Sequence, residues 1–115
     1  MKTSFQTKLF FQCLVLFFSA NILAADPIWI DVRTPDECNS GHVSEAANIP
    51  YTEIADGISA LTTDKDASIY VYCRSGKRSG IAKKTLDNLG YTQVVNVGGI
   101  DEAMKKAAAE SAHDP

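Results

Sequence analysis

One cysteine, Cys73, stands at the start of the only dense cluster of positive charge in this sequence. It follows the apolar run Ser68–Tyr72, and the five residues after it are Arg74, Ser75, Gly76, Lys77 and Arg78. We expect a helix to begin near the end of this loop, so that its unpaired N–H groups and the positive end of its dipole face the cysteine. In such surroundings the pKa of a cysteine falls from about 8.5 toward roughly 3.5–7.5. The sequence therefore predicts a nucleophilic thiolate at Cys73.

A nucleophilic thiolate beneath an anion-binding loop is suited to covalent catalysis on a small anionic substrate. We expect Cys73 to be the catalytic residue and the loop around it to favour an anion. The two histidines, His42 and His113, and the other cysteines stand at no spacing typical of metal ligands. The sequence therefore predicts neither a metal nor a cofactor.

The elements that must position this loop are short strands alternating with helices. We expect strands over residues 28–30, 47–49, 68–72 and 93–97. Helices are expected from Pro35, with Thr34 as N-cap, and over residues 52–61, 77–89 and 101–111. Alternation of this kind favours an open α/β sheet with helices on its faces. Ligands of such sheets bind at the carboxyl ends of the strands, where Cys73 lies.

The apolar spacing predicts which side of two helices faces the core. In the helix after Cys73, four apolar residues are expected on one side, namely Ile81, Ala82, Leu86 and Leu89, and Gly90 is placed to end the helix. In the weaker helix over 52–61, the corresponding residues are Ile54, Ile58 and Leu61. The run 68–72 lacks polar alternation, as in a strand buried on both faces of a parallel sheet.

The N-terminus has the layout of a secretory signal peptide. Lys2 and Lys8 precede an apolar run over residues 9–18, and small residues follow at Ala20, Ala24 and Ala25. We expect residues 1–25 to be cleaved and residues 26–115 to form a single domain with no membrane anchor. Cleavage would remove two lysines and change the formal net charge from −3 to −5. A chain this acidic is not expected to bind nucleic acid.

Five ordered motifs resemble those of single-domain rhodaneses, and most of all the periplasmic phage-shock-protein E type. They are C-R-S-G-K-R-S at 73–79, W-I-D-V-R-T-P-D-E at 29–37, G-H-V at 41–43, A-x-N-I-P at 46–50 and V-G-G-I at 97–100. The resemblance implies an α/β fold with an open, mainly parallel sheet of four or five strands and helices on both faces.

The same resemblance implies a function, thiosulfate:cyanide sulfurtransferase. Cys73 would take the outer sulfur of thiosulfate as a persulfide and pass it to cyanide or a thiol acceptor, and the loop 74–78 would form the cradle. The resemblance also implies a periplasmic location, and we expect a monomer. Two positions depart from the family pattern, since Cys38 stands where an aromatic residue is common and Ala103 where tryptophan is frequent.

Two other functions remain open at this point. A non-enzymatic persulfide carrier of a sulfur relay would need the same thiolate. A cysteine phosphatase of the related Cdc25-like type would have its arginine as the sixth residue after the cysteine, whereas here Arg78 is the fifth and Ser79 the sixth. The shorter loop makes a smaller cradle, which favours sulfur over phosphate.

Several residues near these motifs have alternative interpretations. Cys38 is either a small core residue or a disulfide partner of Cys73, since secreted proteins often pair their cysteines. Glu37 either completes a capping box or contacts the loop cations. Asp31 and Arg33 are expected to form a structural brace, and the resemblance implies that His42 fixes a turn.

Overall fold

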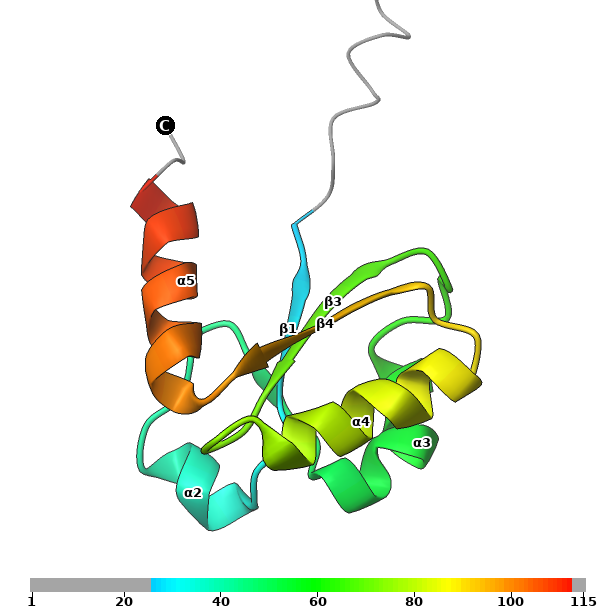
Figure 1. The fold of residues 1–115 in the computed structure, drawn as a ribbon, viewed down its shortest axis with the longest axis horizontal. Coiled ribbons are helices and arrows are strands. Elements are labelled where there is room, and N and C mark those ends of the chain that lie inside the picture. The colour runs from blue at the N-terminus through cyan, green and yellow to red at the C-terminus, as the bar shows by residue number, and fades with distance from the viewer. Residues whose placement is uncertain (1–25, 113–115) are drawn as a thin grey trace, which may run out of the picture.

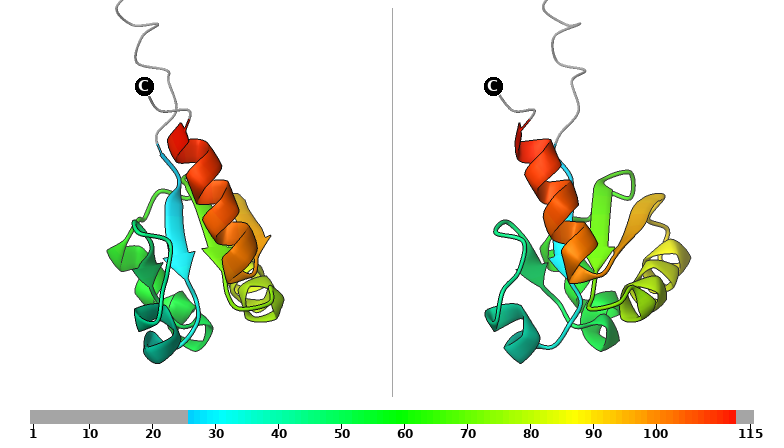
Figure 2. Two further views of the ribbon diagram at one scale, coloured as in Figure 1. Left: turned by 90° about the vertical axis from the view of Figure 1, so that its left-hand side faces the viewer. Right: turned by 60° about the vertical axis from the view of Figure 1, so that its left-hand side comes forward.

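The computed structural model describes residues 26–112, and within them the chain forms a four-stranded sheet in which all strands are parallel (Figures 1 and 2). The strands are β1 (Ile28–Asp31), β2 (Ala47–Asn48), β3 (Ser68–Tyr72) and β4 (Gln93–Gly98), in the order β2-β1-β3-β4. The predicted open α/β fold is confirmed, with four strands. The predicted leader and His113 lie outside the described residues. In the described part, no helix combines the length and apolar character needed to cross a membrane.

Alternate residues of β1 and β3 point to opposite faces of the sheet, and both faces are covered. On one face, Ile30, Ile69 and Val71 pack under α4 (Lys77–Asn88) and the short helices that precede β3. On the other, Trp29 and Tyr72 pack under α5 (Ile100–Ala112), which lies across the sheet from α4 (Figure 1). Burial on both faces explains why these strands are rich in β-branched and aromatic residues.

The segment predicted as one helix over 52–61 is instead three short turns. These are η1 (Tyr51–Glu53), α3 (Ile54–Gly57) and η2 (Ile58–Ala60). Ile54 and Ile58 are buried as predicted, but Leu61 is 39% exposed. Gly57 accounts for part of the break, because a glycine inside a helix costs about 0.5–1 kcal/mol. A larger residue would not fit easily at this position, since its Cβ would lie 3.0 Å from Ile49 Cγ2.

Helix α4 has a narrower buried side than its apolar spacing predicts. Ala82 and Leu86 are fully buried, whereas Ile81 and Leu89 are 46% and 40% exposed. The helix packs on β3, β4, α3 and η1, and β4 is an edge strand, so no element of residues 26–112 covers the flank of α4 beyond β4. The prediction that Ile81 and Leu89 face the core was therefore wrong.

Two local features bring the chain to the site. Helix α2 (Pro35–Asn39) begins with the predicted capping box, in which Thr34 Oγ1 accepts from the Glu37 N–H and Glu37 Oε1 accepts from the Thr34 N–H. The pairing of β3 with β4 shifts by one residue, so that Tyr72 lies opposite Gly98 rather than Val97. This shift places the Gly98 carbonyl where it accepts a hydrogen bond from the Cys73 N–H at 3.1 Å.

Candidate active site

Cys73 lies directly after β3, at the carboxyl end of the sheet, and is fully buried. The chain then makes a short loop and enters α4 at Lys77, with Gly76 as the N-cap. This is the strand-loop-helix arrangement predicted from the sequence. It places the thiol at the edge of the sheet where open α/β folds bind their ligands.

Gly76 gives the loop its shape. Its φ of 97° lies in the left-handed region, where a residue with a Cβ is strained. A Cβ there would also lie 3.3 Å from the Gly98 Cα atom, which is closer than ordinary contact. A glycine at this position therefore lets the loop turn tightly against the end of β4.

Hydrogen-bond donors converge on the sulfur of Cys73. The Gly76 N–H donates to Sγ at 3.0 Å and the Ser79 N–H at 3.4 Å, and Ser79 Oγ lies 3.4 Å from the same atom. Both N–H groups belong to the first turn of α4, where they have no partner within the helix. The loop therefore forms a cradle that stabilises an anion at Sγ.

The pKa of the Cys73 thiol reflects this cradle. Burial raises the pKa, but hydrogen bonds from the Ser79 side chain and from the N–H groups of Ser79, Ser75 and Gly76 lower it, and the net result lies below the ordinary value of 9.0. The direction agrees with the prediction. The causes that lower the pKa are hydrogen bonds, whereas the sequence predicted a contribution from the loop cations as well as from the N–H groups.

The three loop cations do not act alike. Arg78 is partly buried and makes a bidentate ion pair with Glu37, at 2.8 Å from Nη1 to Oε1 and 3.0 Å from Nη2 to Oε2. The side chains of Arg74 and Lys77 are exposed and take part in none of the ion pairs of residues 26–112. Only the charge of Arg78 is thus balanced by a carboxylate.

Glu37 combines both roles that its sequence position allowed. It closes the capping box of α2 and holds Arg78 of α4 at the same time. The hydrogen bond from Arg78, followed by that from the Thr34 N–H, lowers its pKa from 4.5 to about 2. This ion pair joins α2 to the active-site loop across 41 residues of sequence.

Two residues of the site, Ser79 and Asn96, were not among the predicted site residues. Ser79 is fully buried, and its Oγ donates to Asn96 Oδ1 at 2.7 Å. Asn96 Nδ2 in turn donates to the Gly76 carbonyl at 3.0 Å. The signal in the sequence was the polar Asn96 between Val95 and Val97, two residues before the glycine pair at 98–99.

The expected brace of Asp31 and Arg33 is present beneath the site. Arg33 Nη2 donates to Asp31 Oδ2 at 2.6 Å and to the Gly41 carbonyl at 2.7 Å. Burial raises the pKa of Asp31, but its hydrogen bonds with Arg33 outweigh burial and lower it overall. His42 donates from Nδ1 to the Cys38 carbonyl at 2.9 Å, since a carbonyl can only accept. The pair and His42 fix the turn after α2.

Cys38 is a free, buried thiol on α2, and Cys73 is also free. Burial, followed by the neighbouring Asp31 carboxylate, raises the pKa of the Cys38 thiol. The thiol pKa is thus raised at Cys38 and lowered at Cys73. The interpretation of Cys38 as a small core residue agrees with its burial.

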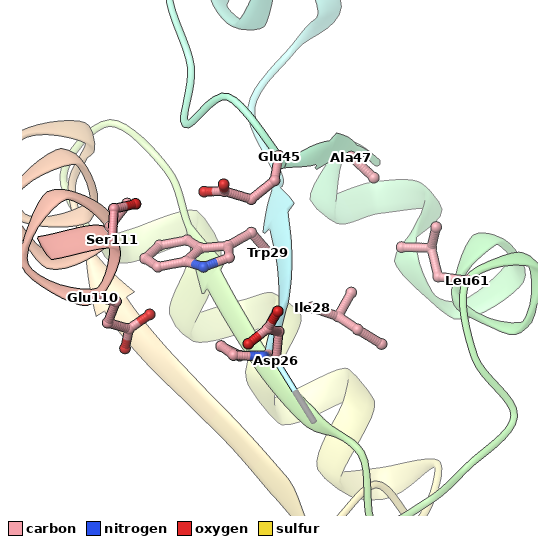
Figure 3. Close-up of a pocket in the computed structure, with 10 residues that line it drawn as sticks. Asp26, Ile28, Trp29, Glu45, Ala47, Leu61, Glu110 and Ser111 are labelled. Atoms are coloured by element: carbon pink, nitrogen blue, oxygen red, sulfur yellow. The ribbon is translucent and has the colours of Figure 1, made fainter. Parts of the chain in front are cut away.

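A separate hollow of about 420 Å³ lies at the other end of the sheet (Figure 3). It is bordered by the start of β1 and the last turns of α5, including Asp26, Trp29, Glu45 and Glu110. None of its lining residues belongs to the loop 73–79. A small anion needs converging N–H groups more than volume, so the Cys73 loop is the stronger candidate for the site.

The sequence matches the family model described as "Rhodanese-like domain" over residues 18–106. It is 45% identical to a protein of Escherichia coli named "Thiosulfate sulfurtransferase PspE", over 81% of this chain and 89% of that protein. It is also 36% identical to a protein of Allochromatium vinosum named "Sulfurtransferase", over 64% of this chain and 67% of that protein.

The fold is similar to that of solved structures as well. A structure described as "rhodanese with anions from E. coli" superposes with a TM-score of 0.65 at 42% sequence identity. The match covers 67% of this chain and 91% of the other.

Proposed function

This chain belongs to the rhodanese-like domain family, and from that premise we propose that it is a thiosulfate sulfurtransferase whose Cys73 carries the transferred sulfur as a persulfide. The observation that supports this most directly is the convergence of Gly76 and Ser79 donors on the buried Sγ atom. These donors favour the thiolate that sulfur transfer requires. They are also placed to hold the anionic persulfide that forms from it.

The reaction divides into two displacements. First, the Cys73 thiolate attacks the outer sulfur of thiosulfate, the S–S bond of thiosulfate breaks, and sulfite leaves with the electron pair. Then cyanide, or the thiolate of an acceptor, attacks the outer sulfur of the persulfide. The bond between the two sulfurs breaks, thiocyanate or an acceptor persulfide leaves, and the electron pair returns to Cys73. This order predicts ping-pong kinetics.

The loop residues have different roles in substrate binding. The Gly76 N–H hydrogen-bonds the sulfur at 3.0 Å, and the Ser75 N–H adds to the lowering of the Cys73 pKa. The exposed cations Arg74 and Lys77 attract the thiosulfate dianion. Arg78, whose guanidinium keeps N–H groups beyond the two that Glu37 accepts, contributes a donor to the bound anion.

The proposal includes where the enzyme acts. Residues 1–25 are a cleaved signal peptide, and residues 26–115 act as a monomeric domain in the periplasm. The layout of the N-terminal residues supports this location.

The test is intact-mass measurement after treatment with thiosulfate. Wild type should gain the mass of one sulfur atom, cyanide should remove it, and Cys73→Ser should gain nothing. The matched control is Cys38→Ala, which should load as wild type does because Cys38 is buried on α2. An adduct that persists in Cys73→Ser would refute the assignment.

Turnover separates the enzyme from the two alternatives. With thiosulfate and cyanide in excess, an enzyme forms thiocyanate continuously, whereas a carrier stops after one equivalent. Hydrolysis of a phosphate monoester by the same sample, lost in Cys73→Ser, would instead favour a phosphatase.

A further inference from the structure

Ser79 and Asn96 form a polar pair behind Cys73. The Ser79 hydroxyl lies 2.7 Å from Asn96 Oδ1 and 3.4 Å from Cys73 Sγ. A serine hydroxyl has one proton and can donate it to only one of these atoms at a time. The shorter distance assigns the proton to Asn96 Oδ1 while Sγ is uncharged, and the hydroxyl can rotate to donate to Sγ when the sulfur carries negative charge.

Asn96 is held in place without Ser79. Its Oδ1 also accepts from the Gly98 N–H at 3.0 Å, and its Nδ2 donates to the Gly76 carbonyl at 3.0 Å. When the Ser79 hydroxyl turns to the sulfur, Asn96 Oδ1 therefore keeps one hydrogen bond and is not left unsatisfied. The rotation exchanges one hydrogen bond for another and leaves no buried polar group without a partner.

We propose that Ser79 is a further catalytic residue that stabilises Cys73 Sγ as the leaving thiolate when the persulfide is unloaded, and that Asn96 positions its hydroxyl. This inference rests on the proposed sulfurtransferase function. In the persulfide the negative charge is on the outer sulfur and Sγ is neutral. When the cyanide carbon bonds to the outer sulfur, the S–S bond breaks and its electron pair moves to Sγ. Charge thus develops at Sγ in this step, where a hydrogen bond accelerates the reaction.

The test measures the two half-reactions separately in Ser79→Ala. Persulfide-loaded protein is mixed with cyanide, and the unloading rate should fall by about tenfold, because the charge that develops on Sγ loses one hydrogen bond. Loading by thiosulfate, compared at full ionisation of the thiol, should be no slower than in wild type, because a thiolate with one hydrogen bond fewer is more nucleophilic. An unloading rate equal to that of wild type, or an equal loss in both steps, would overturn the inference.

The control for the loss of a hydroxyl is Ser68→Ala. Ser68 is an exposed residue at the start of β3, and its hydroxyl makes no hydrogen bond within residues 26–112. Both half-reactions should match those of wild type in this variant. Ser79→Ala should also unfold at the wild-type temperature, since Asn96 Oδ1 retains its bond from Gly98.

A double-mutant cycle tests the role of Asn96. If Asn96 acts through the Ser79 hydroxyl, Asn96→Ala alters the unloading rate and the pH profile of Cys73 alkylation in wild type, but much less once Ser79→Ala is present. Additive effects would show that Asn96 only braces the backbone and would remove it from the proposal. If wild type itself forms no persulfide, the proposed function fails. If wild type loads and unloads while Ser79→Ala behaves identically, only this inference fails.

Discussion

Cys73 owes its reactivity to hydrogen bonds more than to neighbouring charge. Arg78, the one partly buried cation of the loop, is balanced by Glu37, while Ser79 and Gly76 contact the sulfur directly. The thiol pKa of Cys73 is therefore expected to depend less on salt concentration than that of a cysteine activated by exposed cations, because salt screens exposed charges but not buried hydrogen bonds.

The lowered thiol pKa predicts a pH dependence of stability. A thiolate favoured by the fold adds stability that is present at and above 9.0, the ordinary thiol pKa, and is lost as the pH falls through the lower folded-state pKa. Cys73→Ser does not titrate in this range. The difference in unfolding free energy between wild type and Cys73→Ser should therefore increase as the pH rises toward 9.0, as measured by urea denaturation at a series of pH values.

Cys38 is a control, because the shift of its thiol pKa is opposite in sign to that of Cys73. Its pKa is raised, so its contribution is fully present below 9.0 and is lost as the pH rises toward the folded-state value. The difference in unfolding free energy between wild type and Cys38→Ala should stay constant up to pH 9.0, where the difference for Cys73→Ser grows, and should shrink above pH 9.0. Slopes of the same sign for the two cysteines would contradict this account of the site.

At the scale of elements, the junction between the loop and α4 depends on a single backbone conformation. Gly76→Ala should destabilise the protein by roughly 1–2 kcal/mol, the cost of the left-handed region for a residue with a Cβ. Because the Gly76 N–H lies 3.0 Å from Sγ, the variant should also raise the pKa of Cys73, as seen in the pH profile of its alkylation.

Gly80 is the matched control in the same helix. A Cβ at this position would meet Asn96 Nδ2 at 3.5 Å, which is ordinary contact, and the residue lies within α4. Gly80→Ala should therefore stabilise the protein by up to about 1 kcal/mol, because alanine has the higher helix propensity. The pH profile of Cys73 alkylation should stay as in wild type. If both glycine variants lost similar stability, the left-handed geometry of Gly76 would not be the cause.

The strand-loop-helix around Cys73 could be predicted because each part has a local signal: an apolar strand, a loop glycine and a helix start. Ser79 and Asn96 could not be paired in this way, because they are 17 residues apart and meet only where α4 packs against β4. The exposure of Ile81 has a similar origin. Its apolar spacing is local, whereas the edge position of β4 beneath α4 is a property of strand order.

At the scale of the whole molecule, the core lies between Ile28 and Ala107. Both buried clusters, with the apolar residues packed against them, fall within these bounds. A chain that begins at Asp26 should therefore unfold with the same thermal midpoint as the full chain, as measured by circular dichroism. A chain that ends at Ile100 should have a clearly lower midpoint, because it lacks Ala103 and Ala107 of the cluster around Trp29. A large loss on removing residues 1–25 would contradict a domain that begins near residue 26.

The hollow of Figure 3 is bordered by both ends of the described chain, since Asp26 and Ser111 line it together, while Cys73 lies at the opposite edge of the sheet. A tether or fusion partner joined at either end would therefore stand away from the reactive loop. The enzyme can be immobilised on a surface, or linked in tandem to a second module, with the loop around Cys73 at the far edge of the sheet from the attachment point. The same proximity makes the two ends suitable for joining in a circular permutant.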